Sequence, residues 1–353
     1  MENVLINEFK LHRARMRKHV LALGGAGLAL AAVALWSVAI GSTAIPLQDI
    51  FGLTLGRLVA PSNTTAYDLS LNTIVFDIRL PRILMAGLAG SALAAAGAAY
   101  QGMFRNPLAD PYLTGISQGA ALGAVTGFLL PAATPAALIP LLAFIGALIS
   151  VMAVFSIART GKTAPVTTLI LGGVAIGAFL SSFTSYLLII SGDKVHGIIF
   201  WLLGTFSLAD WWRVAIMTPY VLVGMLTLLL LARSLNVMQL DEDQAQQLGI
   251  NVEKTKLVIL AAATIATAAA VCFCGAIGFV GIIIPHAIRL VFGPDYRLLL
   301  PMSMLTGAAF LILADTAART IMSPQEIPVG IITALIGAPF FLYILNRKKK
   351  AIF

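Results

Sequence analysis

Apolar blocks about 20 residues long alternate with short polar segments along most of the chain. An α-helix rises 1.5 Å per residue, so a block of this length matches the ~30 Å hydrocarbon core of a bilayer. The expected membrane-crossing blocks are residues 20–40, 82–103, 112–131, 136–158, 165–190, 213–232, 256–275, 278–292, 299–318 and 327–346. The pattern predicts an all-α integral membrane protein, with one transmembrane domain over residues 1–353.

The eighth block, residues 278–292, differs from the others because its ~15 residues reach only ~22 Å. We expect a short helix there, following a glycine-rich bend at Gly275–Gly281. Two connections are longer than the topology requires: an outer polar loop over residues 41–77 and an inner loop over residues 233–255. A third, residues 192–212, is expected to hold a short interfacial helix with three tryptophans, Trp201, Trp211 and Trp212.

Small residues recur at helical spacing in two blocks, where they predict close helix contacts. The second block carries Gly87, Gly90, Ala94, Gly97 and Ala98, and the fifth carries Gly172, Gly173 and Gly177.

Composition agrees with a membrane protein, since 59% of the 353 residues are hydrophobic and only 11% are charged. A soluble domain usually has about 25% charged residues. The formal net charge of +8 would suggest nucleic acid in a soluble protein. Here the basic residues lie between apolar blocks, so we expect them to set membrane topology rather than to bind nucleic acid.

The basic residues also orient the chain. With ten crossings and a cytoplasmic tail over residues 1–19, the inner side holds 17 of the 23 Lys and Arg residues. The outer side holds the other six, Arg57, Arg79, Arg82, Lys194, Arg213 and Arg319. Because positive residues favour the cytoplasmic side, both termini are expected there.

No motif in the chain predicts catalysis, a metal site or a cofactor. Gly161-Lys162-Thr163 resembles the end of a phosphate-binding loop, but position 156 is Ser where that motif needs glycine. Cys272 and Cys274 lie in an apolar block and are expected to pack as small apolar residues. The chain is therefore predicted to be a conduit without its own ATP site, and not an enzyme.

An ion-coupled secondary transporter is the alternative, and it usually needs an ionisable residue deep in the membrane. Asp315 comes nearest, but an i, i+4 pair with Arg319 explains it more simply. His286, the only histidine within a block, is expected to bond to a neighbouring helix.

Several stretches, in order over residues 75–345, resemble the permease subunits of type II ABC importers. They are Arg79-Leu-Pro-Arg82, Arg105-Asn-Pro-Leu-Ala-Asp-Pro111, Gly115–Gly123, Leu248-Gly249, Gly275–Arg289, Leu313–Arg319, Glu326–Gly330 and Gly337-Ala-Pro339. The resemblance implies a ten-helix permease that carries an iron-siderophore, haem or cobalamin across a prokaryotic inner membrane. It also implies a homodimer, two separate ATPase subunits, and a periplasmic or extracellular substrate-binding protein.

The resemblance further implies roles for three groups of residues. The inner loop would dock on the ATPase through Leu240, Asp241, Glu242, Ala245, Leu248 and Gly249. Here the chain departs from the family pattern, with Asp241 in place of glycine before the glutamate and Gln246 in place of arginine after the alanine.

A cytoplasmic gate would include Asn106 and Leu108, for which a turn set by Pro107 and Pro111 is an equal alternative. The binding protein would dock on Arg79, Arg82 and Arg319. Contact with lipid headgroups, or pairing with Asp77, is the alternative for Arg79 and Arg82.

Overall fold

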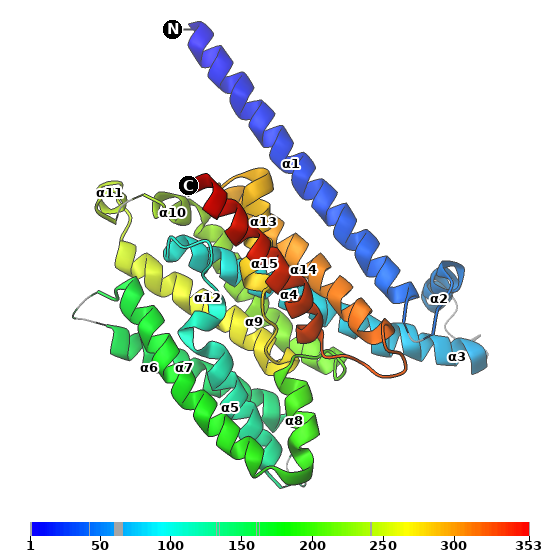
Figure 1. Ribbon diagram of the computed structural model, residues 1–353. Coiled ribbons are helices and arrows are strands. Elements are labelled where there is room, and N and C mark those ends of the chain that lie inside the picture. The colour runs from blue at the N-terminus through cyan, green and yellow to red at the C-terminus, as the bar shows by residue number, and fades with distance from the viewer. Residues whose placement is uncertain are drawn as a thin grey trace.

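The computed structural model describes residues 2–41, 43–59, 66–131, 133, 135–159, 161, 163–240 and 242–352. The regular elements in this part of the chain are all helical (Figure 1). The α-helices are α1 (Glu2–Ala39), α2 (Leu47–Val59), α3 (Ala66–Asn72), α4 (Leu80–Met103), α5 (Ile116–Leu129), α6 (Leu138–Ala158), α7 (Val166–Ile189), α8 (Val195–Leu202), α9 (Trp211–Leu230), α10 (Ala232–Val237), α11 (Glu242–Gln247), α12 (Val252–Cys274), α13 (Val280–Phe292), α14 (Tyr296–Thr320) and α15 (Val329–Ile352). A π-helix, η1 (Thr73–Arg79), joins α3 to α4, and two short 3-10 helices are η2 (Pro111–Thr114) and η3 (Gly192–Lys194).

Each of the ten predicted spans contains a helix, which confirms the predicted fold class. Seven helical segments within the described residues are long and apolar enough to cross a membrane. Three shorter apolar helices complete the set, over residues 116–129, 280–292 and 329–343. As expected for the eighth span, α13 is short and follows an irregular stretch with positive φ at Gly275 and Phe279.

Helix α4 forms the centre of the bundle and is buried along nearly its whole length, with α14, α12, α13 and α9 packed around it. Its glycines allow this close packing, as predicted. A Cβ atom added at Gly90 would lie 2.1 Å from the carbonyl oxygen of Gly307 in α14. One added at Gly97 would lie 2.0 Å from the carbonyl oxygen of Gly281 in α13. The α4–α13 contact therefore depends on the absence of a side chain at Gly97.

Gly97→Ala is expected to destabilise the protein by about 1–3 kcal/mol, because the backbones of α4 and α13 would have to separate. Gly24→Ala in α1 is the matched control, since nothing lies within 4 Å of a Cβ atom added there. The control should be neutral or slightly stabilising, because alanine favours a helix over glycine. Unfolding midpoints in detergent micelles measure both. Equal midpoints for the two variants would show that the α4–α13 contact tolerates a methyl group.

Two predictions about the connections are wrong. The outer segment over residues 41–77 is not a simple loop, because it holds α2, α3 and most of η1, and the helix that contains α4 already begins at Ala66. Leu71 and Val75 are buried and give this early part of the helix an apolar side that packs on the bundle. The short helix in the third connection, α8, carries only Trp201, whereas Trp211 and Trp212 begin the next long helix, α9.

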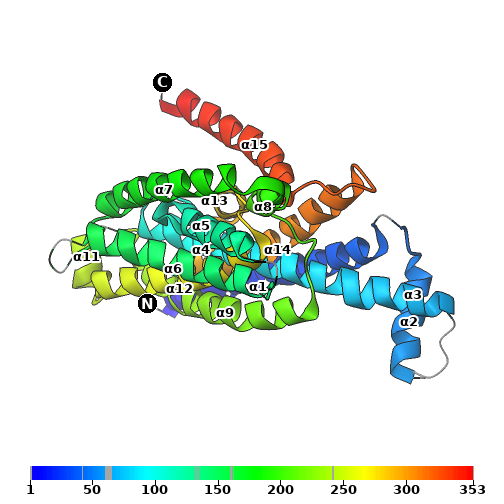
Figure 2. The same cartoon turned by 90° about the horizontal axis from the view of Figure 1, so that it is seen from below.

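Both chain ends lie on the side of the bundle that carries α10 and α11 (Figure 1). The elements α2 and α3 lie at the opposite end, which Figure 2 shows again from below. This placement agrees with an even number of crossings. Figure 2 also shows α7, α13 and α15 along one face of the bundle.

Candidate functional site

The three arginines that the sequence predicts on the outer side, called here the outer arginines, are brought together by η1, α4 and α14. Arg79 is the last residue of η1, Arg82 lies in the first turn of α4, and Arg319 lies in the last turn of α14. All three are buried, with 4%, 7% and 7% of their surfaces exposed. The continuous helical stretch that carries Arg79 and Arg82 begins upstream of both, at Ala66.

Arg82 is held by two carboxylates from distant parts of the chain. Its Nε donates to both carboxylate oxygens of Asp315, at 3.0 and 2.9 Å, and its Nη2 donates to Oδ1 at 2.8 Å. Its Nη1 donates to Oε1 of Glu326 at 2.8 Å. The predicted pair between Asp315 and Arg319 is present, but at 3.8 Å it is longer than the bidentate pair with Arg82. The main partner of Asp315 is therefore Arg82.

Arg79 and Arg319 bind the end of α1. Arg79 donates through Nη1 to the carbonyl oxygens of Val38 and Ala39, and through Nη2 to that of Thr43. Arg319 donates to the carbonyl oxygen of Ser37 at 2.6 Å and to its hydroxyl oxygen at 2.7 Å. Asp77, the partner suggested by sequence for Arg79 and Arg82, is exposed. These arginines cap the last carbonyl groups of α1, which have no partner within the helix.

The segment predicted to dock on the ATPase, residues 240–249, is called here the coupling segment. It lies at the opposite end of the bundle, around α10 and α11. Leu240 and Leu248 flank α11, with 43% and 62% of their surfaces exposed, whereas Ala245 is fully buried. Gly249 follows the end of α11 with φ of +83°, the left-handed conformation that is common just after a helix. Asp241 lies outside the described residues. Two exposed leucines at a polar end of the molecule form a surface suited to a protein partner.

The coupling segment is tied to the loop that carries the predicted gate residues. Glu242 bridges Lys256 at 2.9 Å and approaches Nη2 of Arg105 at 3.9 Å. Nε of Arg105 donates to the carbonyl oxygen of Met238 at 3.1 Å, and the Gln239 amide donates to that of Gly102 at the same distance. Arg105 adopts a positive φ of 48°, which is uncommon outside glycine. The two loops are therefore linked by several contacts, and sequence analysis missed Arg105 and Gln239.

Asn236 fixes α10 to the start of α14. Its amide donates to Oδ1 of Asp295 at 2.7 Å, and its oxygen accepts from the backbone N–H of Tyr296 at 2.8 Å. Burial raises the pKa of Asp295, but hydrogen bonds from the backbone of Arg297 and from Asn236 outweigh it, so the pKa lies below its usual value. A carboxylate that stays ionised caps α14 and holds α10 in place.

The predicted gate residues Asn106 and Leu108 form a tight turn. The side-chain oxygen of Asn106 accepts from the backbone N–H of Leu108 at 3.0 Å, and its carbonyl accepts from Ala109 at 3.1 Å. Asn106 is exposed and Leu108 is partly exposed. The turn suggested by the flanking prolines is present, and it leaves the Asn106 side chain at the surface of this end.

A break between helices forms a third notable feature. Between α12 and α13, residues 275–279 are irregular, and Tyr112 satisfies the backbone there. Its hydroxyl donates to the carbonyl oxygen of Ile277 at 3.0 Å and accepts from the N–H of the same residue at 3.0 Å. Nearby, the backbone N–H of Thr205 donates to the carbonyl oxygen of Cys274, and that of Val329 donates to the carbonyl oxygen of Gly204, each at 2.8 Å. Irregular backbone at membrane depth is tolerated where protein buries it or where it lines a cavity.

No group of three or more potential metal ligands occurs in the part of the chain that the structure describes. Cys272 and Cys274 are buried and free, in agreement with a packing role. His286 is buried within α13. The Gly161–Thr163 stretch joins α6 to α7, rather than a strand to a helix as in a phosphate-binding loop.

Comparison with known proteins shows extended similarity. A model of the FecCD transport family matches residues 29–347. The cobalamin import system permease protein BtuC of Halobacterium salinarum is 46% identical over 330 residues, covering 91% of this chain and 89% of that protein. The hemin transport system permease protein HmuU of Yersinia pestis is 40% identical, covering 82% and 87%. A solved inward-facing structure of a metal-chelate type ABC transporter superposes with a TM-score of 0.78 at 31% identity, covering 93% of this chain and 99% of that one.

Proposed function

The chain belongs to the FecCD transport family and is the permease subunit of an ABC importer for an iron chelate, haem or cobalamin, and we propose that it forms one of two identical halves of the translocation pathway. The family match over residues 29–347 carries the function. We expect transport to be driven by ATP hydrolysis in two partner subunits, because this chain has no complete phosphate-binding loop of its own.

The second copy is proposed to pack along the face formed by α7, α13 and α15 (Figure 2). Large apolar side chains on this face are exposed in the single chain, among them Leu171, Phe179, Val291 and Leu335, at 62–74% of their surfaces. The short helix α13 and the irregular residues before it belong to this side, and such backbone is not stable against lipid. A pathway between two copies would provide the protein and water that it needs.

An acidic surface of the substrate-binding protein is proposed to dock at the outer arginines, Arg79, Arg82 and Arg319. Support comes from their clustering at the end opposite α10 and α11. Within this cluster, Glu326 is the more accessible partner of Arg82, with a third of its side chain (33%) exposed, against 2% for Asp315. A carboxylate of the binding protein would therefore reach Arg82 by replacing Glu326, while Asp315 stays in place.

The ATPase subunits are proposed to dock on Leu240, Asp241, Glu242, Ala245, Leu248 and Gly249, at the cytoplasmic side of a prokaryotic inner membrane. The exposure of Leu240 and Leu248 supports this surface. The gate role of Asn106 and Leu108 remains a proposal, supported by the contacts between Arg105 and the coupling segment. Both termini would be cytoplasmic, as the basic residues favour.

Reconstitution tests the proposal that partner subunits hydrolyse ATP while this chain forms the pathway. The purified chain alone is expected to hydrolyse no ATP, because it lacks a phosphate-binding loop. In proteoliposomes, it should take up radiolabelled chelate only when ATPase subunits, binding protein and ATP are all present. ATPase activity in a preparation shown to be free of other subunits would contradict this. Uptake that survives ATP depletion but stops when the proton gradient collapses would favour the ion-coupled carrier instead.

A further inference from the structure

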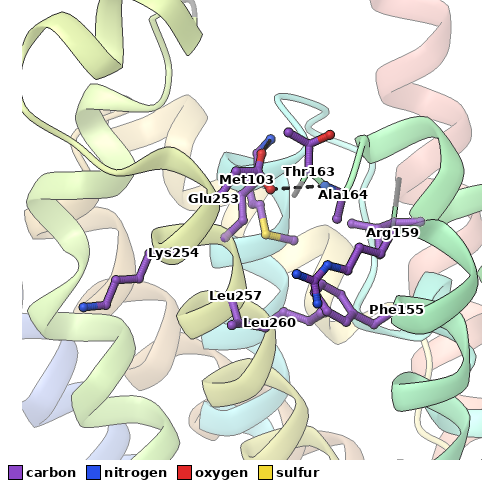
Figure 3. Close-up of a pocket in the computed structure, with 11 residues that line it drawn as sticks. Met103, Phe155, Arg159, Thr163, Ala164, Glu253, Lys254, Leu257 and Leu260 are labelled. Atoms are coloured by element: carbon purple, nitrogen blue, oxygen red, sulfur yellow. Dashed lines mark hydrogen bonds and ion pairs between the residues drawn. The ribbon is translucent and has the colours of Figure 1, made fainter. Parts of the chain in front are cut away.

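A hollow with a basic rim opens at the α10–α11 end of the bundle, between α12 and the end of α6 (Figure 3). Its volume is about 220 Å³. The floor is apolar and the rim carries charge; the floor residues are Met103, Phe155, Leu169, Leu257 and Leu260, and the rim residues are Arg159, Glu253, Lys254 and Lys256. Such a combination suits a ligand that has an anionic head and an apolar body.

The apolar floor continues along the membrane-spanning part of the same two helices. A second hollow of about 380 Å³ lies between α6 and α12 and shares Phe155, Leu257 and Leu260 with the first. Its other lining residues are almost all apolar or small, and Met152 and Ala261 are exposed at its edge. The two hollows together form a groove, named here the α6–α12 groove, that runs from the basic rim into the hydrocarbon region.

Among the rim residues, Arg159 supplies the positive charge that is available to a ligand. Lys256 is buried and bridges Glu242 and Glu253, at 2.9 and 3.1 Å. Arg159 donates through Nε to the carbonyl oxygen of Gly161 at 3.0 Å, and its two terminal nitrogens make no ion pair or hydrogen bond to the described residues. Figure 3 shows its side chain reaching into the hollow toward Leu260, whereas Lys254 points away.

We propose that the α6–α12 groove binds an anionic phospholipid, with its phosphate on Arg159 and one acyl chain along Phe155, Leu257 and Leu260. The charge favours an anionic headgroup, since Glu253 is paired with Lys256 while the guanidinium of Arg159 has no carboxylate partner among the described residues. Basic pockets between membrane helices at the cytoplasmic side are suited to such headgroups. The apolar extension favours a lipid over a free phosphate ion, because a phosphate ion has no apolar part that could bind there. Of the face proposed for the second copy, only Leu169 at the start of α7 lines the groove, and no residue of α13 or α15 does.

Photolabelling of the complete transporter in nanodiscs tests this site. The probe is phosphatidylglycerol with a diazirine in one acyl chain, and phosphatidylcholine with the same chain is the neutral comparison. Peptide mapping is expected to place the phosphatidylglycerol label on residues 148–156 and 257–265. Arg159→Gln should lower this labelling about fivefold, the contribution of roughly one basic residue near an anionic lipid. Arg17→Gln is the matched control, because it removes an exposed positive charge from α1 near the same end.

A second variant tests the groove without changing its charge. Ala261→Phe fills the apolar extension and should reduce the labelling, whereas Val223→Phe on the exposed side of α9 should not.

Four results would overturn the proposal. Equal labelling by the two lipids, or an equal effect of Arg159→Gln and Arg17→Gln, would show that no anionic headgroup is selected. Displacement of the label by inorganic phosphate would indicate a site for free phosphate. Labelling of the permease alone that disappears when the ATPase subunits are added would identify the groove as a protein-docking surface.

Discussion

Asparagine in place of Asp315 is expected to destabilise the protein by about 3–5 kcal/mol, as when one partner of a buried ion pair is removed. Asp315 is 1% exposed and accepts three hydrogen bonds from Arg82, at 2.8–3.0 Å. Its loss would leave the buried guanidinium group of Arg319 without its nearest negative charge, and that of Arg82 with only Glu326. The free energy of unfolding in detergent micelles, titrated with a denaturing detergent, measures the effect.

Glu326→Gln is the matched control for Asp315→Asn. It also removes a carboxylate that binds Arg82, but a third of the Glu326 side chain (33%) is exposed. We therefore expect a cost of about 0–1 kcal/mol, typical of an ion pair near the surface. Equal losses for the two variants would mean that burial does not set the strength of this network. Because Arg82 stabilises the fold through Asp315, charge reversal at Arg82 would alter folding as well as any docking of a binding protein.

Glu242→Arg is expected to abolish ATP-driven uptake while the protein still inserts and dimerises. The variant would place a third cation beside Lys256 and Arg105, which Glu242 now approaches at 2.9 and 3.9 Å. Repulsion would move α11 away from α12 and from the gate loop. A central residue of a docked interface contributes about 2 kcal/mol or more, so ATPase affinity should fall at least ~30-fold. Uptake and ATP hydrolysis, measured in the same proteoliposomes, report the loss of coupling.

Asp243→Arg is the control for Glu242→Arg, because it makes the same charge change on an exposed position of the same helix. It should retain more uptake, since Asp243 forms none of these bridges. Leu248→Asp tests the proposed ATPase surface separately, since 62% of Leu248 is exposed in the single chain and no bridge depends on it. Normal uptake by both Glu242→Arg and Leu248→Asp at matched expression would contradict the proposal that this segment couples the permease to the ATPase.

Local pattern was sufficient for much of the fold. Each apolar block became a helix, because a segment in lipid has to satisfy its backbone hydrogen bonds internally. Gly90 and Gly97 identified the closely packed helix α4, since small residues mark such contacts in membranes. The glycine-rich stretch before residue 280 correctly indicated a bend and a short helix.

The sequence by itself therefore determined the class of protein, the number of spans and the turns, all of which depend on neighbouring residues. Only the tertiary structure decided which charged groups meet. Arg82 and Asp315 are 233 positions apart, and sequence analysis paired Asp315 with Arg319 because a helix brings i and i+4 together. Likewise, Arg105 reaches Glu242 only because the ends of α4, α10 and α12 converge. Hydropathy shows that a helix is apolar, but the partner of each polar side chain depends on how whole helices pack.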